Sequence, residues 1–177
     1  MDDRPPTGPT GPLSSTAAPG DPQQRLCPGC GEELPLDCFR KDVKVCTWCD
    51  YSSMERRARA RWGDIRKRAI RKRVPALLGM SLPQFVAWYV EQPDCCAYCG
   101  LTIAEAKRLR LRTTFGYYVS WDIDRIDPNR SYEPGNLALS CFACNTAKGA
   151  HLTAQEARIV GEAMRQVWDA RLQAIGS

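Results

Sequence analysis

Four Cys-x-x-Cys pairs constrain the fold of this chain more than any other feature of its sequence. Eight of its ten cysteines belong to these pairs, which are Cys27/Cys30, Cys46/Cys49, Cys96/Cys99 and Cys141/Cys144. Two residues between thiolates let one tight turn direct both sulfurs at a single ion, and a second such turn completes a tetrahedron. In a reducing compartment, so many cysteines are more typical of metal ligands than of disulfides.

The first two pairs predict a four-cysteine zinc ribbon. Fifteen residues separate Cys30 from Cys46, a spacing within the range of structural zinc sites. Gly29 and Gly31 supply the permissive backbone that such a turn needs. Redox pairs or free thiols are the alternative interpretation. Cys38, between the pairs, is expected to be a small buried packing residue.

The second two pairs predict a second zinc site on weaker evidence, because 41 residues separate Cys99 from Cys141. Each of these pairs has an aromatic residue next to a ligand. Cys95 is an alternative to Cys96, but three residues would then separate it from Cys99, so we favour Cys96. Both sites would be all-sulfur and would leave no position for water, so both zinc ions would be structural. Any metal chemistry then needs a third ion.

Composition predicts where the folded parts begin. The first 24 residues are rich in Pro, Gly, Ser and Thr and are expected to be disordered. The chain has neither a signal peptide nor a run apolar and long enough to span a bilayer, which favours a soluble cytoplasmic protein of a bacterium or phage-infected cell. We expect a tail over 1–24, the ribbon over 25–53, a basic helical segment over 54–93, a zinc domain over 94–152 and a C-terminal helix over 153–177.

Positive charge is concentrated between residues 54 and 73, although the net charge of the chain is only +5. Ala and Arg favour a helix here, which Pro75 should end or kink. The basic residues surround the predicted helix, so it lacks an ordinary amphipathic face, and a polyanion is the natural partner. A solvated linker helix is the alternative. The expected nucleic-acid-binding residues are Arg56, Arg57, Arg59, Arg61, Arg66, Lys67, Arg68, Arg71, Lys72 and Arg73.

The rest of the chain predicts an α+β fold around the second zinc site. A helix should follow Ser81 as its N-cap and place Phe85, Trp88 and Tyr89 in the core. Residues 117–123 and 136–140 are typical of strands, the loop between them is dense in turn formers, and 143–149 is typical of a short helix. This makes a compact ββα unit. Thr153 opens a last helix whose apolar stripe should pack on that unit or on a second chain.

The stretch 96–149 resembles an HNH (ββα-metal) endonuclease domain of the zinc-knuckle kind. The resemblance lies in the order Cys-x-x-Cys-Gly, Asp-x-Ile, Gly-Asn-Leu and Cys-x-x-Cys-Asn-x-x-Lys-Gly. The stretch "CPGCGEELPLDCFRKD" and the basic helix after it are similar to the arm of phage HNH proteins related to the recombination endonucleases. Together the resemblance covers about residues 26–153.

The resemblance implies roles for four residues. Asp124 matches the carboxylate that binds the catalytic divalent ion, and Asn145 matches its second ligand; oxygen ligands favour Mg²⁺ or Mn²⁺. Asn136 matches the asparagine that holds the base through its loop. Arg125 stands where the family usually has the histidine that activates water.

An arginine stays protonated and is no general base, but it can bind phosphate or stabilise developing charge. Asp122, on the same side of an extended strand as Asp124, or water activated on the metal would then have to provide the base. The non-catalytic alternative is that Asp124 and Arg125 form a surface ion pair at the end of a strand. His151, the single histidine, is expected at the surface or in packing.

Three functions are compatible with these features. The first is an HNH-type, metal-dependent endonuclease acting on duplex or branched DNA, with Lys148 adding to the basic surface. The second is a non-catalytic nucleic-acid-binding zinc protein, regulatory or packaging, built on an HNH frame. The third is an adaptor whose last helix makes a homodimer or larger nucleoprotein complex. The presence of Asp124 and Asn145, together with Asn136 and Lys148, favours the enzyme.

Overall fold

The computed structural model describes the chain except for residues 1–22, 72–78, 114–115, 118–119 and 177. The predicted disorder of 1–24 therefore lies outside the described residues up to residue 22, whereas Gln24 already belongs to a strand. Lys72, Arg73 and Pro75 also lie outside the described residues. Within the described residues the fold is mixed α+β, with small two-stranded antiparallel sheets, as the sequence predicts.

Each described strand pairs with the next strand along the chain, β1 with β2, β3 with β4 and β5 with β6. The helices are α1 (Thr47–Asp50), α2 (Met54–Arg71), α3 (Leu82–Glu91), α4 (Ile103–Arg108), α5 (Phe142–Lys148) and α6 (Ala154–Ala174). The strands are β1 (Gln24–Leu26), β2 (Glu33–Pro35), β3 (Arg112–Thr113), β4 (Gly116–Tyr117), β5 (Asp122–Arg125) and β6 (Leu137–Ser140). A short 3-10 helix, Leu36–Cys38, follows β2.

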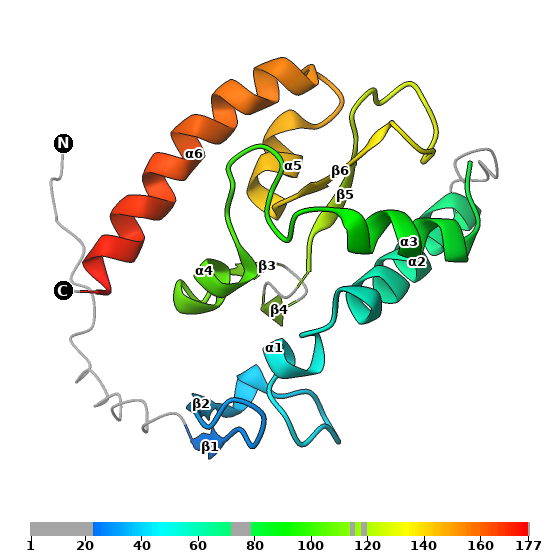
Figure 1. Cartoon of the computed structure of the whole chain (residues 1–177). Helices are drawn as coiled ribbons and strands as arrows, with labels where there is room; N and C mark the ends of the chain where they lie inside the picture. Colours follow the sequence, from blue (N-terminus) through cyan, green and yellow to red (C-terminus); the bar gives the residue numbers. More distant parts are fainter. Residues whose placement is uncertain (1–22, 72–78, 114–115, 118–119, 177) are drawn as a thin grey trace, which may run out of the picture.

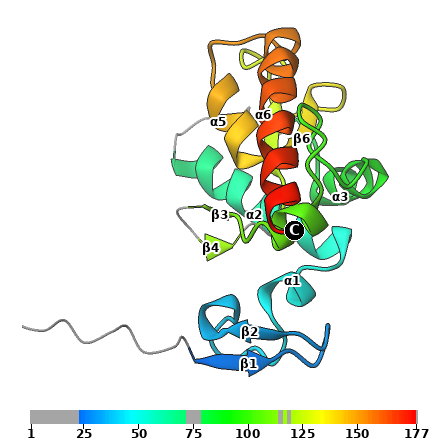
Figure 2. The ribbon, with the colours of Figure 1, turned by 90° about the vertical axis from the view of Figure 1, so that its left-hand side faces the viewer.

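The N-terminal ribbon is a small module below the main body of the molecule (Figures 1 and 2). Its hairpin β1–β2, the 3-10 helix and α1 enclose a core of its own, in which Cys38 is fully buried as predicted. Ion pairs of 2.6 Å join it to the main body at Lys107–Glu32 and Arg112–Asp37. The ring of Trp48 also lies 4.8 Å from that of Tyr117, centroid to centroid.

Helix α2 packs along α3, and this packing gives it a buried face that the sequence does not predict. Ala58 and Ile65 are buried on that face, so the helix is not basic all round. Helix α3 begins as predicted, with Ser81 and Gln84 forming a capping box. Phe85 and Tyr89 of α3 are fully buried.

The predicted ββα unit is present. Strands β5 and β6 pair antiparallel with Ile123 opposite Leu139, and α5 follows directly. The first strand begins at Asp122, later than the predicted residue 117, because Trp121 turns into the core and its indole N–H donates to Asp94 at 2.8 Å.

Helix α6 packs on the ββα unit and crosses the turn that carries Cys96 and Cys99. It begins at Thr153 as predicted, with Thr153 and Glu156 forming a capping box, and it packs against α5 (Figure 1). Gly161 meets the turn at Tyr98 so closely that an added Cβ would lie 2.3 Å from the Tyr98 carbonyl oxygen. Of the helices in the described part of the chain, none has the length and apolarity needed to cross a membrane.

Candidate metal clusters and active-site groove

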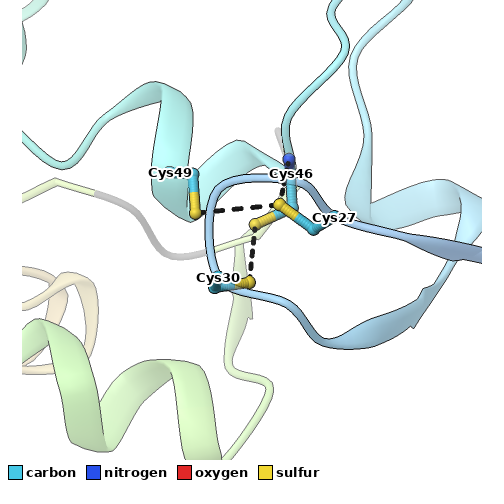
Figure 3. A group of neighbouring side chains, drawn as sticks. All are labelled: Cys27, Cys30, Cys46 and Cys49. Carbon is cyan, nitrogen blue, oxygen red and sulfur yellow. Dashed lines mark hydrogen bonds between the residues drawn. The ribbon is translucent and has the colours of Figure 1, made fainter.

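The first cluster gathers the sulfurs of Cys27, Cys30, Cys46 and Cys49 around one point (Figure 3). The Cys27 and Cys49 sulfurs are 3.8 Å apart, and those of Cys30 and Cys46 are 4.0 Å apart. The first pair lies on a turn that ends at Gly31, whose φ of +71° favours glycine. The second pair begins α1, where the Cys46 backbone N–H donates to the Cys27 sulfur at 3.2 Å.

The second cluster repeats this construction inside the main core. Its sulfurs belong to the predicted Cys96, Cys99, Cys141 and Cys144, all of them buried, and Cys95 is not a member. The Cys99 and Cys141 sulfurs are 3.7 Å apart. Again a positive-φ glycine, Gly100, closes the first turn, and Cys141 is the N-cap of the following helix α5.

Both clusters fit a zinc ion. Sulfurs about 2.3 Å from a central zinc ion form a tetrahedron with edges of about 3.8 Å, which is close to the observed separations. Zinc binds thiolates, and each cluster contains a cysteine with a lowered pKa. Burial opposes ionisation of Cys27, but backbone N–H groups, that of Cys46 first, lower its pKa to about 6. Hydrogen bonds from the other three cysteines, Cys141 first, lower the pKa of Cys96.

A groove of about 810 Å³ lies where the ribbon, α2 and the ββα unit meet. Arg40 and Tyr51 line it on the ribbon side, and Lys67 and Arg68 line it on the α2 side. The ββα unit contributes Asp122 from β5 and Phe142 and Asn145 from α5. The groove therefore combines a basic wall with oxygen-bearing side chains.

Asp122 and Asn145 face each other in this groove. The Asn145 amide nitrogen lies 3.5 Å from the Asp122 carboxylate. Arg61 of α2 approaches the same carboxylate, with its NH2 group 3.4 Å away. The sequence places Asp122 near Asp124 but gives no sign of its contact with α2, because 60 residues separate Arg61 from Asp122.

Asp124 lies behind these residues and is only 5% exposed. The Tyr98 hydroxyl donates to one of its carboxylate oxygens, and the Lys148 ammonium lies 3.2 Å from the other. Burial, and then the hydrogen bond to Asp124, raise the pKa of Tyr98, so this phenol keeps its proton. The recorded contact of Asn145 is with Asp122, not with Asp124. Sequence reasoning missed Tyr98, which lies between two zinc ligands and has no separate signal.

Arg125 is held by the loop between β5 and β6. Its guanidinium donates to the Arg130 carbonyl oxygen at 3.0 Å and lies 5.4 Å from the centre of the Tyr132 ring. It is not among the groove-lining residues. Asn136 braces the same loop, because its side-chain oxygen accepts from the Asp127 N–H at 2.8 Å and its nitrogen donates to the Ser131 carbonyl at 2.9 Å. Asn136 therefore holds the backbone of the loop after β5, and its part in catalysis stays a prediction.

Two of the residues expected to bind nucleic acid are buried instead. Lys148 is 0% exposed, and its ammonium also donates to the Arg125 carbonyl at 2.9 Å. Arg57 is 2% exposed and makes two hydrogen bonds of 2.9 and 2.8 Å to Asp94. Neither has surface left for a phosphate, which corrects that expectation. The described basic residues that remain exposed on α2 are Arg56, Arg59, Arg66, Lys67 and Arg68; His151 is exposed too.

The fold and the site together define a ββα unit framed by four-cysteine clusters, the arrangement of the HNH nucleases. No protein-family model matches the sequence, and no curated protein matches it. A solved structure of the rare-cutting HNH restriction endonuclease PacI, studied for the way it perturbs DNA, is similar to this chain with a TM-score of 0.56 and 28% identity. The match covers 82% of this chain and 96% of that one. In sequence, in fold and in its cysteine clusters the chain is therefore similar to an HNH endonuclease.

Proposed function

We propose that this protein is a metal-dependent HNH-type DNA endonuclease that hydrolyses phosphodiester bonds. The observation that carries the proposal is the groove, in which Asp122 and Asn145 lie at one end of the ββα unit beneath basic residues of α2. The similarity to PacI over most of both chains supports nuclease chemistry and DNA, duplex or branched, as the substrate. Two structural zinc ions in the four-cysteine clusters would hold the frame.

The donor set beside the groove suits a hard divalent ion. Asp122, Asp124 and Asn145 offer oxygen atoms, which Mg²⁺ and Mn²⁺ prefer. The two Asp124 oxygens each retain acceptor capacity beyond the contacts with Tyr98 and Lys148. Such an ion supplies Lewis-acid chemistry, since it neutralises phosphate charge and lowers the pKa of bound water. Following the family pattern, Asp124 and Asn145 are the proposed ligands.

The proton of the attacking water has to go to a group other than Arg125, because a guanidinium remains protonated. Asp122 is the carboxylate that faces the groove, and its side chain is 22% exposed, so it is the proposed acceptor. Arg125 would instead hold the β5–β6 loop through Arg130 and Tyr132. Asp122→Asn should then slow cleavage strongly while leaving DNA affinity intact.

The test is cleavage of supercoiled plasmid by the full chain carrying its zinc ions. Conversion to nicked or linear DNA should require added Mg²⁺ or Mn²⁺ and should be lost in Asp124→Asn, which preserves the size of the buried side chain. Retained zinc content in the variant excludes unfolding as the cause. If neither ion supports cleavage of duplex, branched or single-stranded substrates, the proposal is wrong.

Two observations favour a second function. Both Asp124 oxygens are engaged by Tyr98 and Lys148, and the usual histidine position holds Arg125, as in a frame that binds without cutting. The protein would then be a nucleic-acid-binding zinc protein, regulatory or packaging. Arg125→His separates the two, because a neutral imidazole can accept a proton. Cleavage by the variant but not by the wild type would identify a binder; cleavage by both supports the enzyme.

A further inference from the structure

Two arginines lie near the groove carboxylates, and they differ in what they face. Arg125 follows Asp124 in β5, yet its guanidinium is bound to the Arg130 carbonyl and lies over Tyr132. Arg61 comes from α2, and it lines the groove together with Asp122 and Asn145. The arginine that a substrate phosphate would meet beside these residues is therefore Arg61, although the sequence draws attention to Arg125.

The contacts of Arg61 fix its orientation and leave donors available. Its Nε donates to the Ser120 hydroxyl at 2.9 Å, which anchors the planar group. The contacts of the other two nitrogens are longer: NH2 lies 3.4 Å from both the Asp122 carboxylate and the Ser120 carbonyl oxygen, and NH1 lies 3.6 Å from Asp64. A guanidinium has five N–H donors in a rigid fork that matches two phosphate oxygens.

Arg57, one turn earlier in α2, is an arginine with a structural role and serves as a comparison for Arg61. It is 2% exposed, and both of its terminal nitrogens make short hydrogen bonds to Asp94. The side chain of Arg61 is 26% exposed and has no comparably short carboxylate contact recorded among the described residues. Its terminal nitrogens are therefore placed to exchange weak contacts for stronger ones.

The positive charge of Arg61 offsets the electrostatic repulsion that a phosphate would meet in this groove. A phosphodiester that approaches Asn145 also approaches the carboxylates of Asp122 and Asp64, which repel it. A guanidinium between these carboxylates and the phosphate offsets that repulsion, and in a partly buried groove such an interaction is stronger than in water. The same group lies where negative charge grows as the phosphodiester is attacked.

We propose that Arg61 is a catalytic residue that binds the scissile phosphate through its NH1 and NH2 groups, rather than one of the arginines that hold DNA along α2. This inference rests on the proposed endonuclease function. It predicts that Arg61 acts mainly on the rate of the reaction, whereas the exposed arginines of α2 act mainly on affinity. Arg61→Lys keeps the charge but loses the Ser120 anchor and the fork, so it should recover only part of the rate.

Two measurements on the zinc-loaded full chain test the proposal. The first is the single-turnover rate of plasmid cleavage with Mn²⁺ at saturating protein, compared with affinity for a labelled duplex oligonucleotide without added divalent ion. Arg61→Ala should lower the rate by ~10²-fold or more, the scale for one charge-stabilising donor. Its affinity should fall by less than about tenfold, since one phosphate contact is lost. Arg171→Ala, in the exposed part of α6, is the matched arginine control and should keep the wild-type rate.

The second measurement is the Nε–H resonance of Arg61, assigned as the one absent from the spectrum of Arg61→Lys, which should shift when the duplex oligonucleotide is added. A rate for Arg61→Ala close to that of the wild type overturns the proposal, and so do equal losses of rate and affinity. If the wild type cleaves nothing, the endonuclease function fails by itself. The phosphate contact of Arg61 is then tested by the resonance alone: a shift supports the contact, and the absence of a shift overturns it.

Discussion

The two four-cysteine clusters are built alike and embedded differently. In each, one pair lies on a turn closed by a positive-φ glycine and the other begins a helix. In the ribbon cluster, Cys30 and Cys49 are partly exposed, and the cluster belongs to a small core of its own. In the second cluster all four cysteines are buried in a core shared by α2, α3, the ββα unit and α6.

One local motif therefore supports two kinds of structure. The sulfur geometry depends on a few neighbouring residues, so spacing predicts it. What the cluster stabilises depends on the surrounding core. The second cluster adjoins the site, because Tyr98, between two of its cysteines, donates to Asp124. The ribbon cluster supports a module that touches the main body through ion pairs, the Trp48–Tyr117 contact and the packing of Ile103 against the ribbon core.

The two clusters should differ most in the loss of stability that follows removal of one cysteine from each. Cys144→Ser should abolish cooperative unfolding of the main body, because structural zinc sites are worth about 10–16 kcal/mol in small zinc domains. Cys30→Ser should lose one zinc ion but retain the main unfolding transition. Zinc analysis and thermal unfolding measure both. Equal damage from the two substitutions would contradict the separation of the cores.

The next largest difference in stability is expected between two lysine–carboxylate pairs, one buried in the main body and one at the ribbon. Lys148→Met leaves Asp124 buried without its cation and should destabilise the protein by about 3–5 kcal/mol. Lys107→Met removes the Glu32 pair at the ribbon, where Glu32 is 52% exposed, and should cost about 0–1 kcal/mol. Urea unfolding of both variants makes the comparison. A small effect at Lys148 would mean that the buried pair is not formed.

Two helical glycines offer a smaller, matched test. Gly161→Ala would place a Cβ 2.3 Å from the Tyr98 carbonyl oxygen, so it should destabilise the main body by about 1–3 kcal/mol. Gly63→Ala in α2 meets open space and should stabilise by about 0.5–1 kcal/mol. Opposite signs in thermal unfolding are expected; the same sign would show that α6 does not press on the Tyr98 turn.

The smallest effect on the fold should come from the exposed side of α2. Combined Arg66→Ala, Lys67→Ala and Arg68→Ala should change stability by less than about 0.5 kcal/mol. The slope of log affinity for duplex DNA against log salt should nevertheless fall by up to about three, if each residue contacts one phosphate. Titrations at several salt concentrations measure it. An unchanged slope would place the DNA contacts elsewhere, for example on the ribbon.

Sequence reasoning reached the parts of the molecule that short-range patterns determine. The eight cysteines, the N-cap residues Ser81 and Thr153 and the ββα order all follow from patterns over a few residues. It did not reach side chains whose partners depend on how α2 docks. Arg57 and Arg61 look alike in the sequence, yet one is buried against Asp94 and the other lines the groove.

The burial of Lys148 also could not be predicted from local sequence. A lysine near a predicted site is most simply taken as a surface phosphate ligand, because lysines are rarely buried without a partner. Its partner, Asp124, lies 24 residues away on a different element, and only the packing of α5 on β5 brings them together. Burial of a charged pair is a property of the assembled core, which local patterns do not encode.

The most direct test of the endonuclease account is the cleavage of supercoiled plasmid by wild type and Asn145→Ala, side by side with Mn²⁺. Asn145 faces the groove, and within the described part of the chain its side-chain hydrogen bond is the 3.5 Å contact with Asp122, so the variant should fold and keep two zinc ions. The account predicts metal-dependent cleavage by the wild type, and loss of cleavage with unchanged DNA affinity in the variant. Wild-type cleavage rates in a folded Asn145→Ala would contradict it.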